Sequence, residues 1–105
     1  MDELFETDDD PPVPEGGLLR MLPIINRRGL HARASAKFVQ TVERYHAAVA
    51  VTRAGETVGG RSIMGLLTLG AAMGTRIAVT AVGEDAAECL DAIEALLANR
   101  FGEDE

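Results

Sequence analysis

The chain has 105 residues, which is enough for one ordinary domain and too few for two separate hydrophobic cores. Hydrophobic residues make up 47% and charged residues 26%, a normal globular composition that excludes wholesale disorder, collagen and long coiled coils. With no Trp, one Tyr and three Phe, the composition also argues against a nucleic-acid platform built from stacked aromatic side chains.

The formal net charge of −7 comes from the beginning of the chain. Residues 1–15 hold seven acidic side chains and no basic one, which leaves ten acids and ten bases for residues 16–105. Prolines and a glycine pair accompany this acidic run, and such a composition repels itself and buries little apolar surface. We therefore expect a flexible acidic tail over residues 1–17, followed by one folded domain over residues 18–105.

The N-terminus, the longest uncharged run and the cysteine content together favour a cytoplasmic location. Residues 1–6 contain neither the basic region nor the apolar stretch of an export signal. The longest uncharged run, residues 62–75, is shorter than the roughly 20 residues that a membrane helix needs. A single cysteine, Cys89, excludes an intrachain disulfide and fits a reducing compartment. We expect a cytoplasmic monomer that does not insert into membranes, with Cys89 as a small packing residue.

The domain is predicted to begin with a strand and a helix. Residues 18–25 are mostly apolar and contain Pro23, which favours a sheet position where no amide donor is required. After a loop at residues 26–29, apolar side chains recur at helical spacing and predict a helix from Ala32 to about Tyr45. His46 is expected to lie at the end of this helix and to complement its dipole.

A hairpin and a short helix follow. The β-rich residues 48–53, the turn-forming residues 54–56 and the return segment 57–60 together predict the hairpin. Ser62 is a good N-cap for a helix that continues to Leu69.

The last part of the chain predicts a strand over residues 76–82 and a helix from about Asp85 to Arg100. The predicted order is therefore β-α-β-β-α-β-α. We expect an α+β fold, a two-layer open-faced sandwich in which a four-stranded antiparallel sheet carries three helices on one face.

The residues best suited to a chemical role lie in the segment from Gly29 to Arg33. Gly29 permits a tight backbone just before His31, where the first helical amides, those of Ala32 and Arg33, have no intrahelical acceptor. An anion beside the imidazole would meet these amides and the positive helix end, and the Arg33 guanidinium could bind phosphoryl oxygens. His31 would be the nucleophile, since a phosphoramidate on its nitrogen passes the phosphoryl group on readily. By spacing alone, an ordinary loop histidine or helix cap fits as well.

Two separated motifs resemble one protein family. The run Gly-Leu-His-Ala-Arg-Ala-Ser-Ala-Lys-Phe-Val and the run Ser-Ile-Met-Gly-Leu-Leu-Thr-Leu-Gly, which begin at Gly29 and Ser62, resemble HPr. HPr is the histidine phosphocarrier of bacterial phosphoenolpyruvate-dependent phosphotransferase systems. The resemblance covers roughly residues 18–101. Many family members have a proline where this chain has Ala34, which is expected to loosen the helix start without removing a phosphate ligand.

The resemblance implies a phosphocarrier, which is not an enzyme acting on its own. His31 corresponds to the residue that accepts a phosphoryl group from enzyme I, on the ring nitrogen nearer the backbone (the pros nitrogen), and donates it to a IIA-type domain. Arg33 and the backbone amides of Ala32 and Arg33 would hold the phosphate. The resemblance implies no cofactor.

The resemblance of the second motif implies a regulatory phosphorylation site and a surface that docks partner proteins. Ser62 matches the family site that an HPr kinase/phosphorylase modifies in some bacteria, although a plain N-cap explains a serine here equally well. Ile63, Met64 and Leu67 match apolar residues that dock partner proteins, with core packing as the alternative for Ile63 and Leu67. A basic rim that steers acidic partners would comprise Arg27, Arg28, Lys37 and Arg61.

Two other functions fit parts of the sequence. A carrier of the nitrogen-related branch, which regulates partners instead of feeding sugar permeases, is suggested by residues 101–105 and 66–72. A binding module without phosphoryl chemistry is favoured by residues 26–61, which hold seven basic side chains and two acidic ones, and is disfavoured by the few aromatics, so no nucleic-acid partner is expected. No metal site is predicted, because His31, His46 and Cys89 are far apart and lack paired spacing.

Overall fold

Strands and helices alternate along residues 11–103, the part of the chain that the computed structural model describes. In this part the elements are β1 (Leu18–Pro23), α1 (Ala32–Val42), β2 (Ala48–Arg53), β3 (Glu56–Gly59), α2 (Ile63–Thr68), β4 (Arg76–Val82), α3 (Ala86–Ala98) and the 3-10 turn η3 (Arg100–Gly102). The predicted order of strands and helices is confirmed. Most of the predicted acidic tail lies outside the described residues. No helix within residues 11–103 is long and apolar enough to span a membrane.

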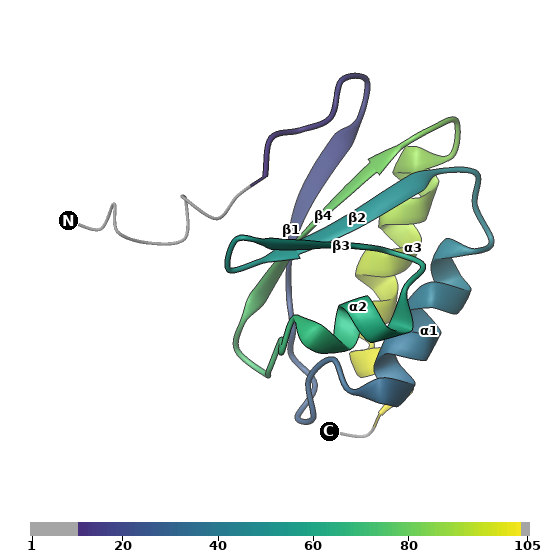
Figure 1. Ribbon diagram of the computed structural model, residues 1–105. Coiled ribbons are helices and arrows are strands. Elements are labelled where there is room, and N and C mark those ends of the chain that lie inside the picture. Colours follow the sequence, from purple (N-terminus) through teal and green to yellow (C-terminus); the bar gives the residue numbers. More distant parts are fainter. Residues whose placement is uncertain (1–10, 104–105) are drawn as a thin grey trace.

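The four strands of residues 11–103 form one antiparallel sheet in the order β1-β4-β2-β3, and the three helices lie on one face of it (Figure 1). β4 pairs with both β1 and β2, so Val79 lies opposite Arg20 on one side and opposite Val51 on the other. β2 and β3 form the predicted hairpin, in which Val51 pairs with Val58. The predicted two-layer α+β architecture with an open sheet face is confirmed.

The core lies between the sheet and the helices because each element contributes apolar side chains at its own period. The sheet contributes alternate residues, whereas the helices contribute residues three or four apart. Completely buried members include Phe38, Val42, Ile77, Val79, Leu90 and Ile93. Cys89 belongs to the buried face of α3, as predicted, and burial raises the pKa of its thiol.

Several elements end earlier than the sequence predicts. β1 ends at Pro23, which lies opposite Arg76, the first residue of β4. Beyond it, Ile24 still donates to the Thr75 carbonyl oxygen at 2.8 Å, and its own carbonyl oxygen accepts from the Gly74 amide at 2.9 Å, so the chain turns there and the ladder does not continue. α1 ends at Val42 and not near Tyr45, because the Arg61 guanidinium donates to the carbonyl oxygens of both residues, at 3.4 and 3.2 Å. The expectation that His46 ends this helix is therefore wrong, since His46 lies in the connection to β2.

The chain turns sharply after α3. The last helix ends at Ala98, two residues before the predicted end, because Arg100 and Phe101 adopt left-handed backbone conformations with φ of 54° and 55°. Such conformations cost L-residues about 1–2 kcal/mol each. Phe101 is only 1% exposed, and burying a phenylalanine side chain contributes about 1.5–3 kcal/mol, which offsets much of this strain. The turn brings Glu103 to His31, the residue that precedes α1.

Candidate functional site

The loop before α1 is tied to the segment that follows α2. Gly29 has φ of +71°, a conformation that favours glycine. A Cβ atom at this position would lie 2.6 Å from the Ala71 carbonyl oxygen and 3.0 Å from the Ala72 Cα. The amide of Leu30 donates to the same Ala71 oxygen at 2.9 Å. The predicted need for glycine before His31 is thus explained by both the backbone conformation and the close approach.

His31 is the N-cap residue of α1. Its extended backbone allows its carbonyl oxygen to accept from the Ser35 amide at 2.8 Å, while its side chain makes no capping hydrogen bond. The amides of Ala32 and Arg33 lie in the first turn, where an α-helix provides no internal acceptor. The first turn of α1 holds no acidic side chain. The positive end of the helix therefore faces the imidazole without a neutralising group of its own.

The imidazole of His31 is bound on one side by a carboxylate. Its Nε2 atom forms a short hydrogen bond with Oε2 of Glu103, and the two side chains are 15% and 19% exposed. Among residues 11–103, the other ring nitrogen, Nδ1, has no hydrogen-bond partner. Nδ1 is the nitrogen nearer the backbone, which the sequence analysis assigns to phosphoryl transfer.

A buried amide holds the carboxylate in place. Asn26 is completely buried, and its Nδ2 donates to the Gly29 carbonyl oxygen at 2.8 Å and to Oε1 of Glu103 at 3.0 Å. Both partners are acceptors, so the NH₂ group of Asn26 must face them. Its Oδ1 is buried without a partner among the described residues.

Glu103 is ionised in this setting. Burial opposes the charge, but hydrogen bonds from His31 and Asn26, with electrostatic attraction to His31 and Arg28, outweigh burial and lower the pKa of the carboxyl group. Sequence reasoning missed both Glu103 and Asn26 as site residues. They are 72 and 77 residues from their partners, His31 and Glu103 respectively, and no local pattern links them.

Basic side chains lie near the histidine. Arg33 is exposed and, within residues 11–103, makes neither a hydrogen bond nor an ion pair. Arg27 and Arg28 are exposed in the preceding loop. Lys37, one turn further along α1, donates from Nζ to the Phe101 carbonyl oxygen at 2.6 Å. Lys37 thus anchors the C-terminal turn.

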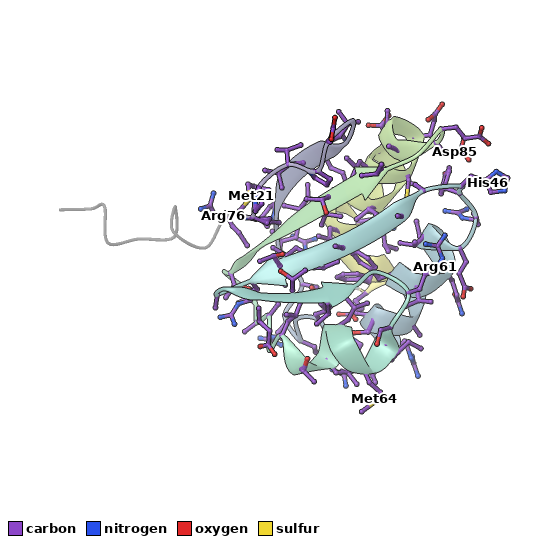
Figure 2. The ribbon with its side chains drawn as sticks, turned by 45° about the horizontal axis from the view of Figure 1, so that its top comes forward. Met21, His46, Arg61, Met64, Arg76 and Asp85 are labelled. Atoms are coloured by element: carbon purple, nitrogen blue, oxygen red, sulfur yellow. The ribbon has the colours of Figure 1, made fainter. Side chains whose placement is uncertain are left out.

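The second motif forms the beginning of α2, which packs against α1. Ser62 is the N-cap and accepts a hydrogen bond from the Gly65 amide at 2.9 Å. Ile63 is 39% and Met64 70% exposed, and Leu67 is half-buried. Leu66, next to Leu67, carries the core contact of this helix. Figure 2 shows Met64 projecting from the end of the molecule opposite His46.

Arg61 lies at the other end of α1 from His31. Besides its bonds to the carbonyls of Val42 and Tyr45, its guanidinium donates to the Ala47 carbonyl oxygen at 2.9 Å. Figure 2 places Arg61 between Met64 and His46. The geometry gives Arg61 a structural task, to terminate α1, and separates it from the other basic residues of the predicted rim.

His46 approaches two acidic residues. Its Nδ1 lies 3.1 Å from a Glu84 oxygen, and its amide donates to Asp85 at 2.7 Å. Figure 2 shows His46 and Asp85 at the same end of the molecule. The three side chains of His46, Glu84 and Asp85 each offer one atom that could bind a metal ion, and these atoms lie within 4.8 Å of one another. The His46 and Glu84 side chains are 83% and 74% exposed, as solvated surface groups often are.

Comparison with known proteins identifies similar sequences and folds. A family model described as the HPr component phosphorylation site of the phosphotransferase system matches residues 20–99. The chain is 46% identical over 88 residues to the phosphocarrier protein HPr of Cupriavidus necator, an alignment that covers 84% of this chain and 99% of the relative. It is 47% identical, with the same coverage, to the phosphocarrier protein HPr of Neisseria meningitidis serogroup A.

A solved structure of an HPr protein has a similar fold. The crystal structure of HPr-C-His from Thermoanaerobacter tengcongensis superposes with a TM-score of 0.80 at 34% identity, and the alignment covers 84% of this chain and 99% of that one. The predicted element order, open sheet and helical layer are those of this neighbour.

Proposed function

Since the chain belongs to the HPr family of phosphocarrier proteins of the phosphotransferase system, we propose that His31 is the residue that carries the phosphoryl group. The carrier domain spans residues 18–105. In this assignment Nδ1 of His31 is the acceptor atom. The protein is a phosphocarrier and not a catalytic enzyme: it holds the group between a donor and an acceptor.

One observation carries the assignment. Nδ1 of His31 has no partner within residues 11–103, and it belongs to the residue that caps a helix whose first-turn amides have no internal acceptor. Backbone amides at a helix N-terminus bind phosphate oxygens, and the helix dipole favours their negative charge. A phosphoryl group on Nδ1 would therefore be met by the amides of Ala32 and Arg33.

Arg33 is the side chain that completes the phosphate site. Its guanidinium is exposed and uncommitted to any other described residue, so it is available to bind phosphoryl oxygens. A guanidinium stabilises the charge that spreads over these oxygens during transfer. Because the phosphorylated imidazole must also give the group up, partial neutralisation by Arg33 and two amides suits a carrier better than a deep cation cluster would.

The proposed donor is enzyme I and the proposed acceptor is a IIA-type domain, both in the cytoplasm. Ile63, Met64 and the exposed part of Leu67 offer an apolar contact surface beside α1. Methionine repacks easily against different partners, which suits a surface that must receive more than one protein. Arg27 and Arg28 add positive charge that steers acidic partners.

Ser62 is proposed as a regulatory phosphorylation site for an HPr kinase/phosphorylase. Its side chain is exposed, and its Oγ now accepts the Gly65 amide. A phosphate there would keep an acceptor at the cap and would add negative charge beside Ile63 and Met64. That charge would weaken apolar docking at this surface.

Mass spectrometry of the intact protein tests the carrier assignment. The chain is incubated with phosphoenolpyruvate and enzyme I from a relative, and His31→Ala is treated in parallel. One acid-labile phosphoryl group is expected on the wild type and none on the variant. His46→Ala serves as the matched control and is expected to keep the adduct. An adduct that survives in His31→Ala, or a wild type that stays unmodified by an enzyme I active on its own HPr, would contradict the proposal.

A further inference from the structure

Three groups converge on the side of the His31 ring away from Nδ1. The Glu103 carboxylate contacts Nε2 through one oxygen and accepts from Asn26 through the other. An ionised carboxylate can only accept hydrogen bonds, so the contact with His31 requires a proton on Nε2. In a neutral imidazole this places the lone pair on Nδ1, the nitrogen without a partner in the described residues.

We propose that Glu103, held by Asn26, is a positioning residue that keeps the proton of the neutral His31 ring on Nε2 and thereby presents Nδ1 to the incoming phosphoryl group. This proposal rests on the assignment of His31 as the carrier. It concerns the orientation and protonation of the ring, because neither Glu103 nor Asn26 need touch the phosphoryl group.

The transfer step balances with this proton arrangement. The Nδ1 lone pair forms a bond to phosphorus while the bond between phosphorus and the donor atom breaks, and that electron pair returns to the donor. The proton on Nε2 stays in place, so the phosphorylated ring gains a positive charge that Glu103 faces directly. In the onward step a nucleophilic atom of the acceptor forms a bond to phosphorus while the Nδ1–phosphorus bond breaks and its electron pair returns to Nδ1. A ring protonated on Nδ1 has no lone pair there and cannot begin the sequence.

The position of Glu103 is fixed from three directions. Phe101, buried in the core, and the Lys37 hydrogen bond to its carbonyl oxygen hold the turn that precedes Glu103. The Asn26 amide holds the carboxylate itself, although its own Oδ1 remains buried without a partner, at a cost of about 1–3 kcal/mol. The lowered pKa of Glu103 keeps the acceptor ionised near neutral pH. The carboxylate is therefore placed independently of the histidine that it orients.

The structure supplies a discriminating pair of variants at this position. In Glu103→Ala the ring loses its acceptor and returns to the intrinsic mixture of tautomers. In Glu103→Gln, the Asn26 NH₂ group selects the carbonyl oxygen of the new amide, so the NH₂ group of glutamine faces His31. Nε2 must then accept, which moves the ring proton to Nδ1. Glutamine, the closer mimic in shape, is thus expected to be the worse replacement.

Two readouts are applied to the full chain. Long-range ¹H–¹⁵N NMR spectra, recorded at a pH where the ring is neutral, report the tautomer of His31, with His46 as an internal exposed reference. Phosphoryl acceptance is timed with phosphoramidate, a small donor that needs no protein docking. Glu56→Gln removes one charge from the distant hairpin and is expected to match the wild type. Wild type should show the Nε2–H tautomer, Glu103→Ala a mixture and Glu103→Gln mainly Nδ1–H.

Acceptance rates should fall in the order wild type, alanine, glutamine, with a loss of at least about 10–100-fold for glutamine, the range seen when the orienting partner of a metal-bound histidine is removed. The NMR spectra also verify that each variant is folded. An unchanged tautomer in Glu103→Gln, or alanine and glutamine variants that accept at the wild-type rate on His31, would overturn the proposal and leave the carrier assignment standing. Failure of the wild type to accept on His31 would instead refute the carrier assignment.

Discussion

Replacing Gly29 with alanine is expected to destabilise the fold by about 2–5 kcal/mol. Two separate costs arise at this position. The backbone has φ of +71°, where an L-residue costs about 1–2 kcal/mol. In addition, the new Cβ would lie 2.6 Å from the Ala71 carbonyl oxygen, and moving packed backbone apart costs about 1–3 kcal/mol.

Gly70 provides the matched control for this prediction. Its φ of +62° imposes a similar backbone cost, but a Cβ at Gly70 meets no atom within 4 Å. Gly70→Ala should therefore lose about 1–2 kcal/mol from conformation alone. The difference between the two variants isolates the close approach of the His31 loop to the segment after α2.

Urea unfolding followed by circular dichroism measures both free energies. Domains have about 5–15 kcal/mol of stability, so a loss near the middle of the predicted range leaves the protein folded without urea, and the far-UV spectrum before unfolding verifies this for each variant. Gly29→Ala should also slow phosphoryl acceptance, because the shifted loop carries His31 with it, whereas Gly70→Ala should not. If the two variants lose the same stability within about 0.5 kcal/mol, the contact with Ala71 is not what requires glycine.

Three further outcomes follow from the structure. Arg61→Met should lower the free energy of unfolding by about 1–2 kcal/mol, because the hydrogen bonds to the carbonyls at and after the end of α1 are lost. Phosphoryl acceptance by His31 should stay unchanged, and slower acceptance would contradict the purely structural role of Arg61. The buried Cys89 thiol, whose pKa is raised, should react with iodoacetamide in urea but hardly at all in the native protein. The intact mass of the protein measures this labelling, and rapid labelling of the native protein would contradict the burial of the thiol. Because the folded-state pKa of Glu103 is lowered, its stabilising contribution is present above the unfolded pKa of glutamate and is lost as pH falls through the folded value. Urea unfolding over a pH series should therefore show the unfolding free energies of wild type and Glu103→Gln converging as the pH falls. His31 and Arg28 are the groups that face the carboxylate. A difference in unfolding free energy that does not change with pH would refute this electrostatic contribution.

Local signals in the sequence predicted most of the fold. β2 and β4 span the predicted residues, and α1 and α2 begin where expected, because β-branched runs, helical periodicity and the Ser62 cap act over a few residues. The ends of elements depended on distant partners. α1 stops at Val42 because of Arg61, which lies 19 residues further along the chain. The left-handed conformation of Arg100 and Phe101 was beyond local prediction, since neither residue favours it and burial of Phe101 stabilises it.

The candidate site divides in the same way. His31, Arg33 and the first-turn amides lie in one short segment, so their spacing at a helix start indicated a candidate anion site. Spacing alone fitted an ordinary loop histidine or helix cap as well, and the resemblance to HPr favoured the phosphoryl site. Asn26 and Glu103 reach the imidazole only through the fold, after the C-terminal turn reverses the chain. Asn26 lies in the loop that the sequence predicts, yet it is completely buried. A buried asparagine is recognised by the acceptors around it, which a sequence does not display.

The strand order governs how this chain can fold. β4 is the last strand to be synthesised, and it separates β1 from β2, so neither β1 nor the β2–β3 hairpin has its full set of partners until residue 82 is available. Of the pairings in the sheet, the hairpin is the local one, whereas β1 must wait for a strand more than fifty residues away. Non-local pairing of this kind slows folding and favours a single cooperative transition. The two halves of the sheet therefore gain their stability together, when β4 enters between them.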